Sequence, residues 1–155
     1  MRLYLVQHGD AAPREINKDR PLTEKGKKDS FKIAEFLKAA GIKIPIIWHS
    51  DKRRAIETAE IFSETVSTRG GTVEKKVGLA PNDPVNPIFS ATKANGIDLM
   101  IIGHLPFLQK LASLALFNSE YYEVLRVITS GVVCLEEGQD GKWQIVFEMT
   151  PELLK

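Results

Sequence analysis

The sequence is poor in cysteine and has no long apolar run. Cys134 is the only cysteine among 155 residues, which excludes an internal disulfide and a Cys-X-X-Cys site. No stretch reaches the roughly 18 to 20 apolar residues that span a bilayer, and the first residues do not have the pattern of a secretory signal. We therefore expect a soluble, cytoplasmic protein without membrane contacts, in which Cys134 is a buried core residue.

An excess of charge of one sign is also missing. Lysine and arginine number 21 against 20 acidic residues, a balance that gives no case for a nucleic-acid partner. The histidines, His8, His49 and His104, have no short-range ligand spacing, so neither a metal site nor another cofactor is expected. Repeats and low-complexity segments are absent, and the length fits one domain over residues 1–155.

Apolar runs alternate with helical patterns along most of the chain. Buried or half-buried strands are predicted in the ranges 2–7, 44–48, 72–77, 99–102, 123–135 and 143–149. Helices are predicted in the ranges 23–40, 52–66, 86–95 and 106–116. This alternation indicates an α/β fold, a three-layer sandwich whose mostly parallel central sheet has helices on both faces and a C-terminal antiparallel hairpin.

Two of the predicted buried strands end in a histidine. His8 follows the first strand and His104 follows the strand at 99–102, while Arg54 lies in the first turn of the helix after the second strand. Because ligands bind outside the carboxyl ends of such strands, these three side chains are expected to meet at one edge. An imidazole nucleophile and a guanidinium clamp suit phosphoryl transfer. Gly9 would let a ligand approach the backbone closely.

Four motifs resemble the histidine phosphatase superfamily, in its phosphoglycerate-mutase-like branch, and are similar to those of SixA-type phosphohistidine phosphatases. They occur in this order over essentially the whole chain, at 7–11, 20–26, 50–59 and 103–106. The resemblance implies one phosphoglycerate-mutase-like domain over 1–155. It also implies that His8 is the transiently phosphorylated nucleophile, that Arg54 clamps the phosphoryl group and that His104 is the second histidine of the pocket.

The resemblance further places Arg20 in a loop that faces the site, with Gly9 among the phosphate-binding residues. Asp83 is the carboxylate nearest to the family's general acid, although the local sequence matches poorly, and an ordinary loop carboxylate is the competing interpretation. A weak acid suffices for phosphohistidine, because imidazole is a better leaving group than an alkoxide. His49 falls outside the motifs and is expected to be a rim residue, and Ser50 is expected to cap the helix that follows it.

Gln7 departs from the family pattern, which has arginine immediately before the nucleophile. Glutamine lacks the charged fork of donors of a guanidinium. The loss of one preorganised donor costs about 2.7 to 4 kcal/mol, or roughly a hundred- to a thousandfold in rate. Arg53 or Arg20 could supply the missing donors, or the Gln7 amide could keep one hydrogen bond to the phosphate.

The function expected from these residues is removal of phosphate from protein phosphohistidine through a phosphohistidine enzyme intermediate. The implied partner is a phosphorylated histidine-containing phosphotransfer protein of a signal-transduction system. Two alternatives remain open. The protein could be a phosphate-binding module weakened as a catalyst by Gln7, or a general small-molecule phosphomonoesterase, which would need a well-placed acid near Asp83.

Overall fold

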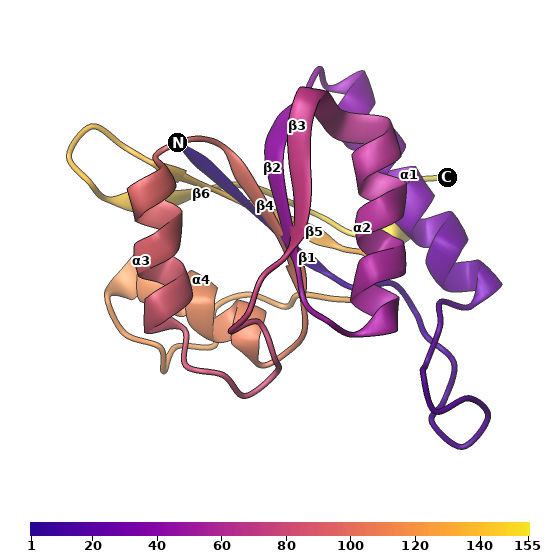
Figure 1. The fold of residues 1–155 in the computed structure, drawn as a ribbon. Helices are drawn as coiled ribbons and strands as arrows, with labels where there is room; N and C mark the ends of the chain where they lie inside the picture. The colour runs from indigo at the N-terminus through magenta and orange to yellow at the C-terminus, as the bar shows by residue number, and fades with distance from the viewer.

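A mixed sheet forms the centre of the structure, a computed structural model that describes residues 1–155 (Figure 1). Its strands are β1 (Arg2–Gln7), β2 (Ile44–His49), β3 (Ser67–Lys75), β4 (Leu99–Gly103), β5 (Val132–Glu137) and β6 (Trp143–Met149). They lie in the order β3-β2-β4-β1-β5-β6. The pairs among β3, β2, β4 and β1 are parallel, whereas β5 pairs antiparallel with β1 and with β6.

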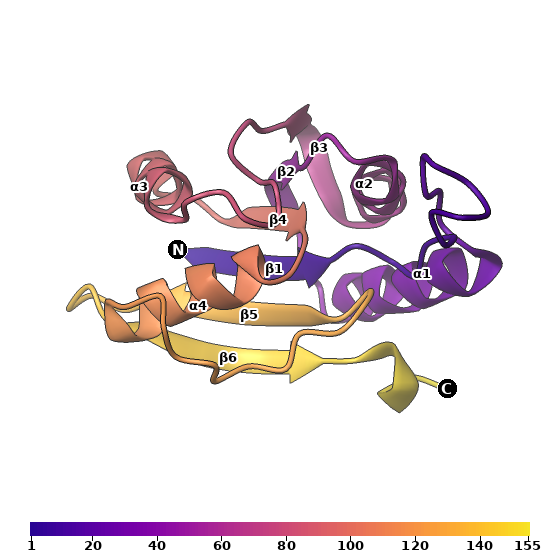
Figure 2. The ribbon, with the colours of Figure 1, turned by 90° about the horizontal axis from the view of Figure 1, so that it is seen from below.

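Helices cover both faces of this sheet. They are α1 (Glu24–Ala39), α2 (Arg53–Val66), α3 (Asn86–Asn95) and α4 (Phe107–Phe117), followed by the short 3-10 helix η1 (Pro151–Leu153). Figure 2 shows α1 and α2 against one face and α3 and α4 against the other. The three-layer α/β prediction with a C-terminal hairpin is therefore confirmed. None of these helices has both the length and the apolar character needed to cross a bilayer.

Successive side chains of β1 enter two different cores, because side chains alternate between the faces of a strand. Leu3 and Leu5 belong to the apolar cluster that includes the buried face of α4. Tyr4 and Val6 belong to the cluster that includes the buried faces of α1 and α2. The same alternation, continued to the end of the strand, directs His8 toward the α2 side of the sheet.

The first turn of α1 is fixed against the loop that follows His8. Thr23 is the N-cap, and its hydroxyl accepts a hydrogen bond from the Gly26 N–H at 3.0 Å. A Cβ at Gly26 would lie 2.1 Å from the carbonyl oxygen of Asp10, so only glycine fits there. The Asp10 carboxylate accepts from the Thr23 hydroxyl at 2.6 Å, which gives Asp10 a structural role in this turn.

Two predicted strands are present but with wrong bounds. The expected strand at 123–135 begins only at Val132, because Leu125 and Val127 are buried in the core without joining a ladder. The predicted strand at 72–77 is also misplaced, because β3 starts at Ser67 and includes Gly70 and Gly71. A register shift against β2 accommodates these extra residues.

Candidate active site

His8 lies at the carboxyl end of β1, with its ring fixed by the next residue. Its backbone N–H donates to the Gly103 carbonyl at 3.0 Å, so the pairing with β4 continues to the site. Its Nδ1 lies 2.7 Å from the Gly9 carbonyl oxygen, which can only accept, so the Nδ1–H is the donor and Nε2 keeps its lone pair. Burial lowers the pKa of His8 to about 4, against an opposing effect of the Gly9 carbonyl. The ring is therefore neutral at pH 7.

Arg54 lies in the first turn of α2 and contacts both histidines. Its Nε–H donates to His8 Nε2 at 3.2 Å, and its Nη2 lies 3.4 Å from His104 Nδ1. Burial, and then the charge of Arg20, lower the pKa of Arg54, but a guanidinium remains protonated in proteins. One fixed positive charge therefore lies between two imidazoles.

His104 follows β4 and completes this cluster. Its ring centroid lies 5.1 Å from that of His8, and the side chain is almost fully buried. Burial, and then the neighbouring His8 and Arg54, lower the pKa of His104 to about 3. The side chains that the sequence placed on three separate elements thus meet at one edge of the sheet.

The Ser50 side chain makes a different contact from the one expected, because Ser50 is not the N-cap of α2. The N-cap residue of that helix is Lys52, and it makes no side-chain cap hydrogen bond. The Ser50 hydroxyl instead lies 2.6 Å from His104 Nε2, and the residue is buried. The sequence shows only that Ser50, like His104, comes just after a predicted strand, and the structure adds that these two strands are neighbours.

Thr58 joins the His8 loop to α2, and sequence reasoning missed it. Its hydroxyl donates to the Arg54 carbonyl at 2.7 Å and accepts from the Gly9 N–H at 3.0 Å. Gly9 has a packing reason to lack a side chain, because a Cβ there would lie 2.8 Å from the Ser30 hydroxyl oxygen. The phosphate-binding role of Gly9 stays a prediction.

Arg20 extends the positive charge of the site outward. Its φ of 50° lies in the left-handed region that non-glycine residues rarely adopt. Its Nε–H donates to the Ala12 carbonyl at 3.1 Å. The side chain lines a hollow of about 300 Å³ whose walls are Arg14, Lys18, Arg20, Lys52 and Arg54. Arg20 and Arg54 therefore share one cavity, and the phosphate-binding role of Arg20 stays a prediction.

Similarity to known proteins places this arrangement in a family. Residues 3–80 match the model of the histidine phosphatase superfamily, branch 1. An uncharacterised protein of Picosynechococcus is 30% identical over 145 residues, which cover 89% of this chain and 86% of that protein. The chain belongs to the histidine phosphatase superfamily.

The fold is shared with solved structures of phosphatases. The protein histidine phosphatase SixA, complexed with tungstate, superposes with a TM-score of 0.88 at 24% identity over 100% of both chains. A phosphoserine phosphatase from Entamoeba histolytica, in complex with 3-phosphoglyceric acid, gives 0.72 at 16% identity over 96% of both chains. The SixA-like fold expected from the motifs is therefore confirmed.

The side chain of Gln7 has a buried polar atom without a hydrogen-bond partner in this member of the histidine phosphatase superfamily. The atom is the amide oxygen Oε1. Arg53 does not replace the missing guanidinium, because its Nε–H donates to Glu57 at 2.9 Å. Arg20 shares one hollow with Arg54 and Arg53 shares an adjoining one, but only the Arg20 side chain has no carboxylate partner.

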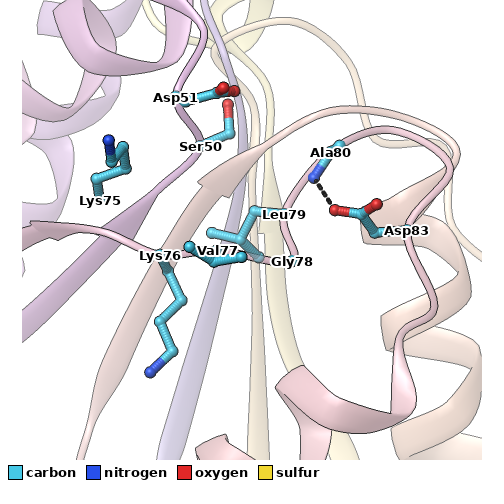
Figure 3. Close-up of a pocket in the computed structure, with 9 residues that line it drawn as sticks. All are labelled: Ser50, Asp51, Lys75, Lys76, Val77, Gly78, Leu79, Ala80 and Asp83. Atoms are coloured by element: carbon cyan, nitrogen blue, oxygen red, sulfur yellow. Dashed lines mark hydrogen bonds between the residues drawn. The ribbon is translucent and has the colours of Figure 1, made fainter.

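The remaining candidates lie around the rim. The Asp83 carboxylate accepts from the Ala80 N–H at 2.9 Å, and Figure 3 shows it turned back on its own loop. Asp83 lines a separate hollow of about 210 Å³, which Ser50 also lines. No hydrogen bond joins Asp83 to either site histidine. His49 is half-buried, with its Nδ1 on the Ser50 carbonyl, and no cluster of three or more potential metal ligands occurs in the structure.

Proposed function

We propose that the protein is a phosphatase that removes the phosphoryl group from protein phosphohistidine through a phosphohistidine intermediate on His8. The observation that carries the proposal is that a neutral His8, whose Nε2 is unprotonated, lies beside Arg54 and His104. Family membership supports phosphoryl chemistry at this site. The structural likeness to the protein histidine phosphatase SixA, over the full length of both chains, supports phosphohistidine as the substrate group.

The first step is attack of His8 Nε2 on phosphorus. The new P–N bond forms as the bond from phosphorus to the substrate imidazole breaks, and that imidazole leaves with the electron pair and takes a proton from water. Arg54 now donates to Nε2, so attack requires its N–H groups to move to the phosphoryl oxygens. Water then attacks the phosphorus and the P–Nε2 bond breaks, so that Nε2 recovers its electron pair with the Nδ1–H still in place. The proton that this water loses neutralises the hydroxide left by the first step, and orthophosphate leaves.

His104 serves as a second donor to the phosphoryl group. Its Nε2 contacts the Ser50 hydroxyl, which can either donate or accept because its proton rotates. In the resting site Arg54 Nη2 can only donate to His104 Nδ1, so the His104 proton is on Nε2 and the Ser50 hydroxyl accepts it. Once Arg54 turns to the phosphoryl oxygens, the Ser50 hydroxyl can rotate and donate to Nε2, and the His104 proton then resides on Nδ1, which faces the phosphoryl position. Ser50 is thus a positioning residue that can hydrogen-bond either neutral tautomer of His104, including the one that donates to the phosphoryl group, without placing a charge on a buried ring.

The position of Asp83 favours phosphohistidine over a phosphate ester. An alkoxide leaving group needs a strong proton donor, whereas an imidazole leaves readily. Asp83 is engaged by the Ala80 amide and makes no hydrogen bond within the histidine cluster. This arrangement disfavours the small-molecule phosphomonoesterase that was the other enzymatic alternative.

The test is phosphate release from a phosphorylated histidine-containing phosphotransfer domain. The protein should release phosphate with many turnovers, and His8→Ala should abolish release. His49→Ala is the matched control, because it removes a histidine close to the site that has no assigned step, and its rate should stay near that of the unmodified protein. Release that is unchanged by His8→Ala contradicts the mechanism.

Gln7 favours a second candidate function, a phosphate-binding module without turnover. A buried amide oxygen without a partner provides no charge at the position where the family has arginine. In that case the protein would bind the phosphorylated domain with the same His8 and Arg54 contacts but release no phosphate. A stable complex that persists for hours, with less than one phosphate released per protein, would identify the module.

A further inference from the structure

A hollow beside Arg54 is lined by basic side chains. The hollow of about 300 Å³ beside Arg54 is lined by five residues, all basic and none apolar: Arg14, Lys18, Arg20, Lys52 and Arg54. Four of them come from outside α2, in the loop after β1 and at the N-cap of the helix. Five of the 21 lysines and arginines of a nearly neutral chain therefore line one hollow.

Asp19 and Asp51 line an adjoining hollow with some of these cations, but few carboxylates come within ion-pair distance of them. Arg14, Lys18, Arg20 and Arg54 take part in no ion pair, and Lys52 contacts only Asp51, at 3.5 Å on the exposed surface. Cations held close together without counter-charges repel one another and disfavour the folded state. Such an arrangement is typical of a site whose counter-charge arrives with a ligand.

Arg20 is held in place before any ligand arrives. Its backbone adopts a left-handed φ of 50°, which costs free energy for a non-glycine residue. The hydrogen bond from its Nε–H to the Ala12 carbonyl fixes the direction of the guanidinium and leaves the two terminal nitrogens for other acceptors. Strain of this kind is retained at functional positions more often than elsewhere.

We infer that this hollow is a second anion subsite, which binds a further phosphoryl or carboxylate group of the same ligand whose phosphoryl group lies at His8. Arg54 joins the two subsites, because its Nε and Nη2 face the histidines while its side chain also lines the hollow. The inference rests on the proposed phosphoryl-binding role of this site. It assigns the substrate class, a phosphorylated compound or protein segment with a second anionic group beside the phosphoryl group.

Binding calorimetry with two probes tests the second subsite directly. Orthophosphate reports the phosphoryl position, and imidodiphosphate, which resists hydrolysis, adds a second phosphoryl group. At 0.15 M ionic strength we expect imidodiphosphate to bind at least about tenfold more tightly, the gain from one charge-assisted hydrogen bond. The double variant Arg14→Ser/Lys18→Ser should lose this gain and still bind orthophosphate.

A matched double variant controls for the loss of two charges. Lys43→Ser/Arg69→Ser removes one lysine and one arginine that are exposed near the opposite edge of the sheet. It should retain the full preference for imidodiphosphate. Equal affinity for the two probes, or a preference that survives Arg14→Ser/Lys18→Ser, contradicts the second subsite, whereas failure of both probes to bind contradicts the proposed function as well.

The source of the second anionic group is determined by a further pair of probes. Phosphohistidine peptides with glutamates beside the phosphorylated residue are compared with peptides that have glutamines there. A protein source predicts that the glutamate peptide is hydrolysed with a KM about tenfold lower, and that Arg14→Ser/Lys18→Ser removes the difference. If imidodiphosphate binds more tightly than orthophosphate but the glutamate peptide shows no advantage over the glutamine peptide, the second anionic group is a phosphoryl group.

Discussion

Replacement of Gln7 by arginine tests whether this chain lacks a donor at its phosphoryl site. The Gln7 Oε1 atom is buried and unpartnered, and no hydrogen bond connects the Gln7 side chain to His8, Arg54 or His104. A preorganised donor at a developing charge contributes about 2.7 to 4 kcal/mol. We therefore expect Gln7→Arg to raise kcat by roughly a hundredfold or more, measured as phosphate release from a saturating phosphorylated phosphotransfer domain.

Gln7→Met is the matched control, because methionine has a similar length and no hydrogen-bonding amide. A buried acceptor without a partner costs about 1 to 3 kcal/mol, so removing it should raise the free energy of unfolding, measured by urea denaturation. Its kcat should stay within about threefold of the unmodified protein. An unchanged kcat in Gln7→Arg, or a steep fall in Gln7→Met, would show that the native amide or another cation already supplies the donor.

Three further predictions follow from contacts in the structure. Ser50→Ala removes the partner of His104 Nε2 and should lower kcat by about tenfold with little change in KM, since it removes one neutral hydrogen bond that holds the ring and stabilises its Nδ1–H tautomer; an unaltered kcat and pH profile would exclude the positioning role. Gly26→Ala drives a Cβ to within 2.1 Å of the Asp10 carbonyl oxygen and should lower the free energy of unfolding by about 1 to 3 kcal/mol, measured by urea denaturation; full stability would refute the close approach. His8 and His104 have folded pKa values of about 4 and 3, below their value of 6.5 when unfolded, so the unfolded state binds protons first as the pH falls below 6.5. Stability should then decline by up to about 1.4 kcal/mol per pH unit for each histidine between pH 6.5 and 4, and denaturation curves that do not change between pH 7 and 5 would contradict this.

The fold was predictable from the sequence where burial follows one regular period. The run at 99–102 is apolar on both faces because β4 is covered by helices on each side. The prediction failed at 123–128, where Leu125 and Val127 alternate like a strand but bury their side chains from an irregular segment. Periodicity reports which side chains are buried, and it does not report whether the backbone has a partner strand.

The sequence predicted those site residues whose positions depend on where a strand ends. His8 and His104 meet because β1 and β4 are neighbouring parallel strands, and Arg54 reaches them from the helix that follows β2. The contacts of Ser50 and Thr58 were not predictable in the same way, because each hydroxyl had an ordinary local explanation within or before a helix. Only the spatial order of the strands shows that these hydroxyls contact His104 and the His8 loop.

Transient phosphorylation of His8 is the measurement that bears most directly on the mechanism. The protein is mixed with a radiolabelled phosphorylated phosphotransfer domain, quenched in alkali within milliseconds, and examined for labelled protein. We predict label on His8 that is stable to alkali and labile to acid, and that is absent from His8→Ala and present in His49→Ala. Multiple turnovers without any labelled protein, or label that remains in His8→Ala, would contradict a phosphohistidine intermediate at this site.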